Sequence, residues 1–327
     1  MKKVIAVVLT LTLSLLFVCS ALADNYVIGI QQFAEHGSLD NCRNGFLEGL
    51  KEAGFAEGEN LTVLYQNAQA NTGDAAQIAD SFVAQNVDLI LAIATPSAQI
   101  SYNSVLNAGK EIPVIYSAVS APIEAGLALE DGLPVGAVTG TSDVLPVTGQ
   151  LTLIRALQPE AKKIGLLYTA SETNSAVQAA EYKANAEAYG FEIVEQIVTQ
   201  GSEVSQAVEA LLPQVDCLSM LLDNTVVSYL TVVLDAANKQ SKPVYGSEIE
   251  QVVLGCVASE GLDYISLGKQ TGAIAARVLN GEKAEDIPFE TIKESALYLN
   301  SDAIEMLGLT IPEALITRGY TDMSAAE

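Results

Sequence analysis

The sequence predicts an α/β protein made of two similar lobes, each an open sheet of parallel strands covered by helices. Short apolar runs rich in β-branched residues alternate with longer, alanine-rich segments of helical length. This alternation is typical of units in which parallel strands are connected by helices. The predicted strands are residues 25–30, 60–65, 87–94 and 112–119 in the first half of the chain, and residues 162–168, 191–198, 215–222 and 242–248 in the second.

The two halves repeat in nearly constant register. The dipeptides Ile28-Gly29 and Gly54-Phe55 recur 136 residues later, Val87-Asp88 recurs 128 residues later, and Pro113-Val114 recurs 130 residues later. Four matches in order indicate two copies of one domain. Because open parallel sheets bind ligands beyond the carboxyl ends of their strands, two facing copies would hold a small molecule in the cleft between them.

The first 23 residues have the composition of a cleavable secretory signal peptide. Two lysines precede an apolar run over residues 4–18, and Ala21 and Ala23 occupy the positions that a signal peptidase reads. The apolar run is shorter than the roughly 20 residues that span a bilayer. We therefore expect an exported protein, periplasmic or extracellular, whose mature chain begins at Asp24.

The cysteines leave two questions open. Cys19 allows a lipid anchor as an alternative, but Val18 stands where a lipoprotein signal would present a small residue. The mature chain keeps Cys42, Cys217 and Cys256, an odd number without zinc-type spacing. A disulfide between two of them and buried free thiols are both compatible with the sequence.

The mature chain is strongly acidic. The formal net charge is −24 for the whole sequence, and it becomes −26 without the two signal lysines. This charge excludes nucleic acid as a partner, since phosphate binding needs a basic face, and solubility is its simplest explanation. No metal-binding or nucleophile motif occurs, so we predict no metal, no cofactor and no enzyme activity.

The only histidine of the chain, His36, lies in the loop after the first predicted strand. A lone histidine in a polar loop is a candidate general base, because its pKa lies near neutrality. The offset of 136 pairs it with Glu172, in the equivalent loop of the second half. A polar residue at the cleft or at the start of a helix is the simpler interpretation of His36.

The third predicted strand runs directly into Thr95-Pro96-Ser97. Proline suits the first turn of a helix, and the free amide groups there, with the two hydroxyls, form an anion site suited to a carboxylate. An ordinary N-cap by Thr95 is the alternative.

The corresponding loops of the second half carry carboxylates instead. Asp223 stands opposite Thr95 at the offset of 128, and Glu248 stands opposite Ala118 at the offset of 130. Either acid is a candidate to bind an ammonium group through a charge-assisted hydrogen bond. The alternatives are a helix N-cap for Asp223 and a solvated carboxylate for each. A donor-rich lobe facing an acidic lobe matches the two ends of an amino acid.

Several stretches, taken together and in order, resemble a known family. They are IGIQQFAEHGSLD, ATPSAQ, LLYTASETNS, LLDNTVVS, YGSE and GLDYISLGKQTGAIAARVLNGEKAEDIP. Over nearly the whole mature chain, the sequence is similar to the extracytoplasmic solute-binding proteins of ABC importers, in the branch associated with tryptophan and other aromatic amino acids. One departure is Gly37, where such proteins would be expected to have proline; it would loosen the first loop.

The resemblance implies a type I periplasmic-binding fold, a clamshell of two Rossmann-like lobes joined by three crossovers. It implies a helix at Gly268–Gly281 that crosses back to lobe one, and a last segment, Asp302–Arg318, on lobe two. The division would be a signal peptide at 1–23, lobe one at 24–142 and 264–296, lobe two at 143–263 and 297–320, and a tail at 321–327.

The same resemblance nominates the ligand-binding residues at the strand ends. They are Gln32, Thr95, Ser97, Ser117, Ala118, Glu172, Asn174, Ser175, Asp223, Asn224, Thr225 and Glu248. Aromatic residues near strand ends are candidates for the walls of a side-chain pocket, with a core position as the alternative. These are Phe33, Tyr116, Tyr168 and Tyr245.

We therefore predict a monomeric binding protein that captures an amino acid, expected to be tryptophan, phenylalanine or tyrosine, by hinge closure. It would deliver this ligand to the membrane permease of an ABC importer. A sensory binding module that hands its ligand to a receptor uses the same clamshell and is one alternative. A secreted hydrolase using His36, Asp223 and Glu248 is the other.

Overall fold

Lobe one is built on six parallel strands in the order β2-β1-β3-β4-β5-β11. The computed structural model describes residues 25–292 and 295–324, so the predicted signal peptide lies outside the described residues. The strands are β1 (Tyr26–Gln32), β2 (Leu61–Asn67), β3 (Leu89–Ile93), β4 (Val114–Ser117), β5 (Val138–Ser142) and β11 (Glu290–Thr291). The helices of this lobe are α2 (Gly37–Glu52), α3 (Thr72–Gln85), α4 (Thr95–Asn107), α11 (Tyr264–Leu279) and the 3-10 turn η4 (Ala284–Asp286).

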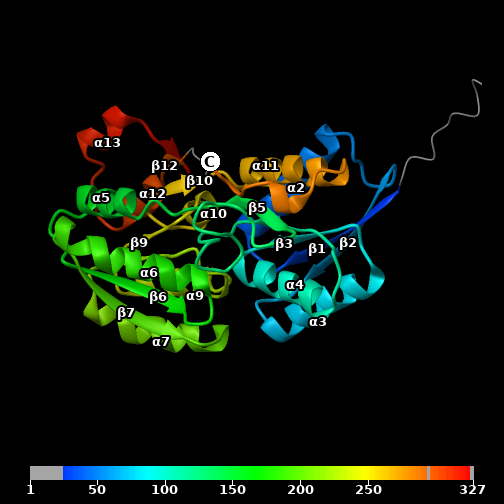
Figure 1. The fold of residues 1–327 in the computed structure, drawn as a ribbon. Coiled ribbons are helices and arrows are strands. Elements are labelled where there is room, and N and C mark those ends of the chain that lie inside the picture. The colour runs from blue at the N-terminus through cyan, green and yellow to red at the C-terminus, as the bar shows by residue number, and fades with distance from the viewer. Residues whose placement is uncertain (1–24, 293–294, 325–327) are drawn as a thin grey trace, which may run out of the picture.

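Helices α2 and α11 cover one face of this sheet, and α3 and α4 cover the other (Figure 1). Helices α2 and α11 touch through their backbones: a Cβ atom on Gly268 would lie 2.2 Å from the carbonyl oxygen of Cys42, and one on Gly45 would lie 2.1 Å from that of Ile265. Because only glycine allows this approach, these positions fix where the late helix α11 docks on lobe one. The helix predicted at Gly268–Gly281 begins earlier, at Tyr264, since the side chain of Asp263 caps it through the amide of Ile265 at 2.9 Å.

Lobe two repeats the arrangement with the strand order β7-β6-β8-β9, again all parallel. Two backbone bonds, Val257 N to Val244 O at 2.8 Å and Gly246 N to Ala258 O at 2.9 Å, join β9 to β10 and extend the sheet through β12 and β13. The strands are β6 (Lys163–Thr169), β7 (Glu192–Val198), β8 (Cys217–Ser219), β9 (Val244–Tyr245), β10 (Ala258–Leu262), β12 (Ser295–Leu299) and β13 (Thr321–Asp322).

The helices of lobe two surround that sheet (Figure 1). They are α5 (Val147–Leu157), α6 (Thr173–Asn185), α7 (Val204–Leu211), α8 (Asn224–Val227), α9 (Leu230–Lys239), α10 (Ile249–Val253), α12 (Ser301–Met306) and α13 (Glu313–Arg318). Short 3-10 turns accompany them: η1 (Ala186–Tyr189), η2 (Gly201–Glu203) and η3 (Leu212–Gln214). Helix α13 is tied to this lobe by the ion pair between Arg318 and Glu260 of β10.

All eight predicted strands are present, and the predicted α/β class with two parallel-sheet lobes is confirmed. Strands β5, β10, β11, β12 and β13 were not predicted. The sequences of β5 and β10, VTGTS and ASEGL, are short and carry polar residues and glycine, yet both strands are buried, with α11 packed on β5 and with α5 and α10 packed on β10.

The chain passes between the lobes three times: from β5 to α5, from β10 to α11, and from β11 to β12. Two details differ from the predicted division. Ser295 and Ala296, assigned to lobe one, already belong to β12, and Thr321–Asp322, assigned to a tail, pair in parallel with β12. Cys42, Cys217 and Cys256 are free and buried. Of the helices in the described part of the chain, none has the length and apolar character needed to cross a membrane.

Candidate ligand-binding site

A cavity lies between the lobes where the strands of both sheets end. Loops after β1 and β4 contribute from lobe one, loops after β8 and β9 contribute from lobe two, and two residues come from the crossings. The lining residues are His36, Leu39, Ala118, Ser120, Asp143, Leu222, Asp223, Asn224, Val227, Glu248 and Tyr264. Four predicted site residues, Ala118, Asp223, Asn224 and Glu248, are therefore brought together.

The lobes are closed tightly over this cavity. Its volume is about 10 Å³, close to the space of one water molecule. A wider groove of about 770 Å³ lies at the outer edge of the cleft, and Phe33, Thr169, Thr225 and Tyr229 are among its lining residues. A ligand the size of an amino acid therefore reaches the inner cavity only when the lobes separate.

Direct hydrogen bonds connect the lobes in this closed form. Glu250 of α10 accepts from Ser38 Oγ at 3.0 Å and from Asn41 Nδ2 at 2.5 Å, both on α2. A Cβ atom on Gly37 would lie 3.1 Å from Glu250 Cγ, so glycine gives room for this contact. On the other side of the cleft, Gln99 of α4 donates to Thr173 Oγ1 at 3.5 Å.

The cavity is acidic and has no compensating cation. Its lining includes the buried carboxylates Asp143, Asp223 and Glu248, and a fourth buried carboxylate, Glu172, is hydrogen-bonded to the lining residue Asn224. None of the ion pairs within the described residues involves these four carboxylates, and no lysine or arginine lines the cavity. Burial raises the pKa of Asp143 to about 6 and that of Glu248 to about 8, since the charged form loses its hydration. A cationic ligand group would relieve this cost.

Glu172 and Asp223 are held by partners within lobe two. Glu172 accepts from both the backbone and the side chain of Asn224 and of Thr225, at 2.7–3.0 Å. Asp223 accepts from Thr169 N at 2.6 Å, Thr169 Oγ1 at 3.0 Å, Ser175 Oγ at 2.7 Å and Val226 N at 2.7 Å. Each oxygen of Asp223 accepts two hydrogen bonds, so the carboxylate has no acceptor position left for a ligand.

The structure therefore favours the N-cap alternative for Asp223 over the ammonium assignment. Asp223 caps α8, and Ser175 and Thr169 complete its hydrogen bonding. Asn174 likewise donates to the carbonyl oxygen of Leu222 at 2.6 Å, although its own Oδ1 has no hydrogen-bond partner. These residues shape the loops of lobe two from within.

Glu248 has a different environment. Within the described residues, its side chain accepts a hydrogen bond from Gln251 Nε2 at 3.0 Å, and the Ser38 hydroxyl also lies close to it. Glu248 makes no capping bond although it occupies the N-cap position of α10. Part of the acceptor capacity of this buried, cavity-lining carboxylate therefore remains available.

The start of α4 also has free donors. Ala94 rather than Thr95 occupies the N-cap, with φ of +80°, so the structure does not support the alternative in which Thr95 caps the helix. The hydroxyls of Thr95 and Ser97 are buried and have no hydrogen-bond partner among the described residues. A positive φ is costly for alanine, and such strained residues cluster at functional sites. This helix end retains the character of an anion site.

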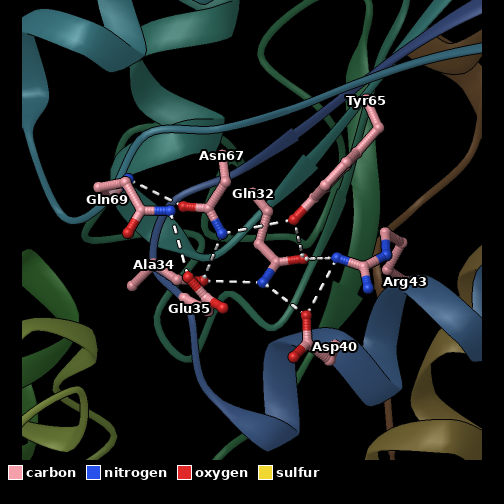
Figure 2. A network of polar contacts seen from close by, with 8 residues as sticks. All are labelled: Gln32, Ala34, Glu35, Asp40, Arg43, Tyr65, Asn67 and Gln69. Atoms are coloured by element: carbon pink, nitrogen blue, oxygen red, sulfur yellow. Dashed lines mark hydrogen bonds and ion pairs between the residues drawn. The ribbon is translucent and has the colours of Figure 1, made fainter.

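Gln32 is not among the residues that line the cavity, and its side chain belongs to a polar network of lobe one (Figure 2). Its Nε2 donates to Ala34 O at 2.8 Å and to Asp40 Oδ1 at 3.1 Å, and its Oε1 accepts from Arg43 Nη1 at 2.7 Å. Arg43 lies over the ring of Tyr65 at 4.4 Å and pairs with Asp40 at 3.0 Å. This network holds the loop that carries His36.

Ser117 also turns away from the cavity, because its Oγ bonds Thr271 Oγ1 of α11 at 2.9 Å. Tyr116 and Tyr245 are core residues, and Tyr168 donates to Glu195 at 2.8 Å. Only Phe33 of the four aromatic candidates lines the groove at the cleft. Burial lowers the pKa of His36 to about 4, so the imidazole is neutral at physiological pH and lines the cavity as a polar wall.

Asp143, Ser120 and Tyr264 are cavity residues that the sequence analysis missed. Asp143 directly follows β5, which was not recognised as a strand. A search for polar residues after every buried segment, including the polar VTGTS, would have found it. Within the described residues, no group of three or more His, Cys, Asp or Glu side chains is arranged to hold a metal ion.

Comparisons with known proteins show the family of this chain. The family model described as ABC transporter substrate binding protein matches residues 27–321. A tyrosine-binding protein of Clostridioides difficile is 40% identical over 282 residues, which cover 86% of this chain and 81% of that protein.

Two solved structures are also similar. A domain from Streptococcus pneumoniae in complex with L-Trp is 34% identical, with a TM-score of 0.87, covering 91% of this chain and 100% of that one. A ligand-free, open substrate-binding protein with adhesive properties from Clostridium difficile is 36% identical, with a TM-score of 0.67, covering 92% of this chain and 100% of that one.

The chain belongs to the ABC transporter substrate-binding protein family. Its predicted type I periplasmic-binding fold is confirmed. It is an extracytoplasmic solute-binding protein whose partners are a small-molecule ligand and a membrane permease. These findings support this function over the sensory and hydrolase alternatives.

Proposed function

We propose that this protein captures an aromatic L-amino acid, tyrosine or tryptophan, between its lobes and presents it to the permease in the closed form. The observation that carries the proposal is the buried, acidic cavity that has no cation of its own among the described residues. An ammonium group bound at Glu248 would supply the missing positive charge.

The carboxylate of an amino-acid ligand has a suitable binding position in lobe one, at the start of α4. The unpartnered hydroxyls of Thr95 and Ser97 lie in the first turn of α4, where free amides and the helix dipole favour a carboxylate. We assign the carboxylate to this helix end and the side chain to the neighbourhood of Phe33. Relatives that bind tyrosine and L-Trp support the choice of an aromatic side chain.

Hinge closure is supported by the two solved relatives. They are nearly equally identical to this chain, at 34% and 36%, but the L-Trp complex has the higher TM-score, 0.87 against 0.67 for the open form. A difference in lobe orientation would account for such a gap between equally related chains. The ligand would stabilise the closed form because only that form brings both sets of loops to it.

We also propose that the protein acts as a monomer without a cofactor and performs no covalent chemistry. The division into lobes at residues 142 and 263 is retained as part of this proposal. The unanchored form released by cleavage after Ala23 is preferred to a lipid anchor at Cys19.

The absence of tryptophan from the sequence makes the ligand test direct. Mature protein is excited at a wavelength that selects indole, before and after unfolding and dialysis, and L-tryptophan is then added back. We expect blue-shifted indole emission on binding and a rise in melting temperature with either L-tyrosine or L-tryptophan. No spectral shift together with no thermal stabilisation by either amino acid would contradict the proposal.

A further inference from the structure

Asp143 is a buried carboxylate at the hinge, distinct from Glu248, Thr95 and Ser97. It follows β5 at the first crossing between the lobes and lines the cavity. Its Oδ2 accepts from the hydroxyl of Tyr264 at 2.7 Å, and its Oδ1 accepts from Ser120 Oγ at 2.9 Å. Tyr264 is the first residue of α11, directly after the second crossing. Asp143 therefore connects two of the three crossings to the loop after β4.

The hydrogen bonds of Asp143 leave acceptor capacity free. Each carboxylate oxygen accepts two hydrogen bonds, and the side chains of Ser120 and Tyr264 provide one to each oxygen of Asp143. Glu248 lines the same cavity and is close enough for the two charges to interact. No basic side chain among the cavity-lining residues is available to either acid.

Such a pair has a chemical consequence. Two buried carboxylates without a counter-ion are unfavourable in the ionised form, and a cation between them removes both the repulsion and part of the desolvation cost. An ammonium group has three donors arranged around one nitrogen, so it can bind two carboxylates at once.

We propose that Asp143 binds the ammonium group of the ligand together with Glu248, so that the ligand contacts the hinge itself. This inference rests on the proposed function, since it assumes an amino-acid ligand. Asp143 is then a specificity residue that selects for the α-ammonium group. Because Asp143 is hydrogen-bonded to Tyr264 and Ser120, ligand binding at Asp143 is also coupled to the crossings that move when the lobes close.

The test compares two ligands that differ only in the ammonium group: L-tyrosine and 3-(4-hydroxyphenyl)propionate. Their dissociation constants are measured by calorimetry for the wild type, Asp143→Asn and Tyr264→Phe. We expect Asp143→Asn to lower the preference for L-tyrosine roughly 10- to 100-fold, with little change for the propionate. Tyr264→Phe should change this preference much less, because it leaves the charge of Asp143 in place.

Asp263→Asn is the matched control. Asp263 lies at the second crossing, is exposed, and bonds Ile265 N and Ser266 Oγ instead of reaching the cavity. An Asp143→Asn variant that weakens both ligands equally, or neither, overturns the inference while the proposed function stands. A wild type that binds neither L-tyrosine nor L-tryptophan overturns the proposed function and the inference with it.

A second measurement leaves Asp143 unmutated, in case Asp143→Asn does not fold. In Glu248→Gln, the preference for L-tyrosine over the propionate should rise as pH increases from 5 to 7. The sign follows because bound ammonium favours ionised Asp143, whose pKa without ligand is raised by burial to about 6. A flat preference over this range overturns the inference.

The ratio of the two affinities is measured because other ionisable groups lie around the cavity. They are His36, Cys42, Glu172, Asp223, Glu250 and Tyr264. Among them, burial raises the pKa of Glu172 to about 7 and lowers that of His36 to about 4. Changes in such groups act on both ligands, whereas the ammonium group is present on one.

Discussion

The ends of the strands in lobe one and in lobe two occupy equivalent places in the fold, but their polar groups are used differently. At the start of α4 in lobe one, the hydroxyls of Thr95 and Ser97 have no hydrogen-bond partner among the described residues. At the equivalent loops of lobe two, Glu172 and Asp223 are saturated by neighbouring amides and hydroxyls. Repetition of a fold therefore does not repeat the chemistry of its loops.

Polar groups that are hydrogen-bonded within the protein shape the binding surface, whereas polar groups without a partner there are free to bind a ligand. Buried polar groups that are fully paired contribute to stability, whereas unpaired ones are costly in the protein alone and become favourable when a ligand bonds them. Asp223 belongs to the first class, and Thr95, Ser97 and Glu248 belong to the second. Substitutions can test this division directly.

Of the substitutions considered, Asp223→Ala should have the largest effect, and this effect is on stability. It removes four hydrogen bonds that join β6, α6 and α8, so the free energy of unfolding should fall by about 3 kcal/mol or more. Chemical denaturation measures this loss. The control is Asp216→Ala, since the half-buried Asp216 also accepts from two backbone amides, of Lys162 and Lys163, and its loss should cost less. Normal stability with lost ligand affinity would instead restore Asp223 as an ammonium ligand.

Glu248→Gln should weaken ligand binding and leave stability unchanged, the opposite of Asp223→Ala. Ligand affinity should fall by about 1.5–3 kcal/mol, as expected for a lost charged hydrogen bond, without loss of stability. Burial raises the pKa of Glu248 to about 8, so the native state holds its proton more tightly than the unfolded state.

The consequence for stability has a definite sign. The contribution of Glu248 to the free energy of unfolding is fully present below the pKa of this group in the unfolded state, near 4.5. This contribution is lost as pH rises through about 8, the pKa in the folded state. Melting temperatures of ligand-free protein measured from pH 5 to 8 should therefore fall more steeply for the wild type than for Glu248→Gln. Parallel curves would show that Glu248 does not titrate in this range.

Thr95→Val and Ser97→Ala should each weaken ligand binding by about 1 kcal/mol through loss of a hydrogen bond to the carboxylate. Both changes leave no internal partner unpaired, so stability should be kept. Ser104→Ala, further along the same helix, is the control. The assignment fails if the variants bind an amino-acid amide and the free amino acid with the same relative affinity as the wild type.

Arg43→Ala should have the smallest effect on binding. Arg43 contacts Gln32, Asp40 and the ring of Tyr65, so its loss should cost about 1 kcal/mol of stability. Because no residue of this network (Figure 2) lines the cavity, affinity should change less than threefold, about 0.6 kcal/mol. A larger loss of affinity would mean that the loop carrying His36 depends on the network for its shape.

Local pattern was sufficient to predict much of this architecture. The apolar runs located eight strands, and the constant offsets between Ile28-Gly29 and its later copy revealed the duplicated lobe. The polar loops after those strands pointed to the cleft. Strands β5 and β10 were not predicted because their sequences contain few apolar residues. Their burial comes instead from the helices that pack on them.

By itself, the sequence determined the two-lobed fold and the set of loops that meet in the cleft, since periodicity and turn residues act over short distances along the chain. The tertiary structure alone decided which polar groups remain free. Asp223 is saturated by Thr169, which lies 54 residues away, whereas Glu248 and Asp143 have few partners and no cation in the cavity. Hydrogen-bond partners come from distant segments, and only the folded chain brings those segments together.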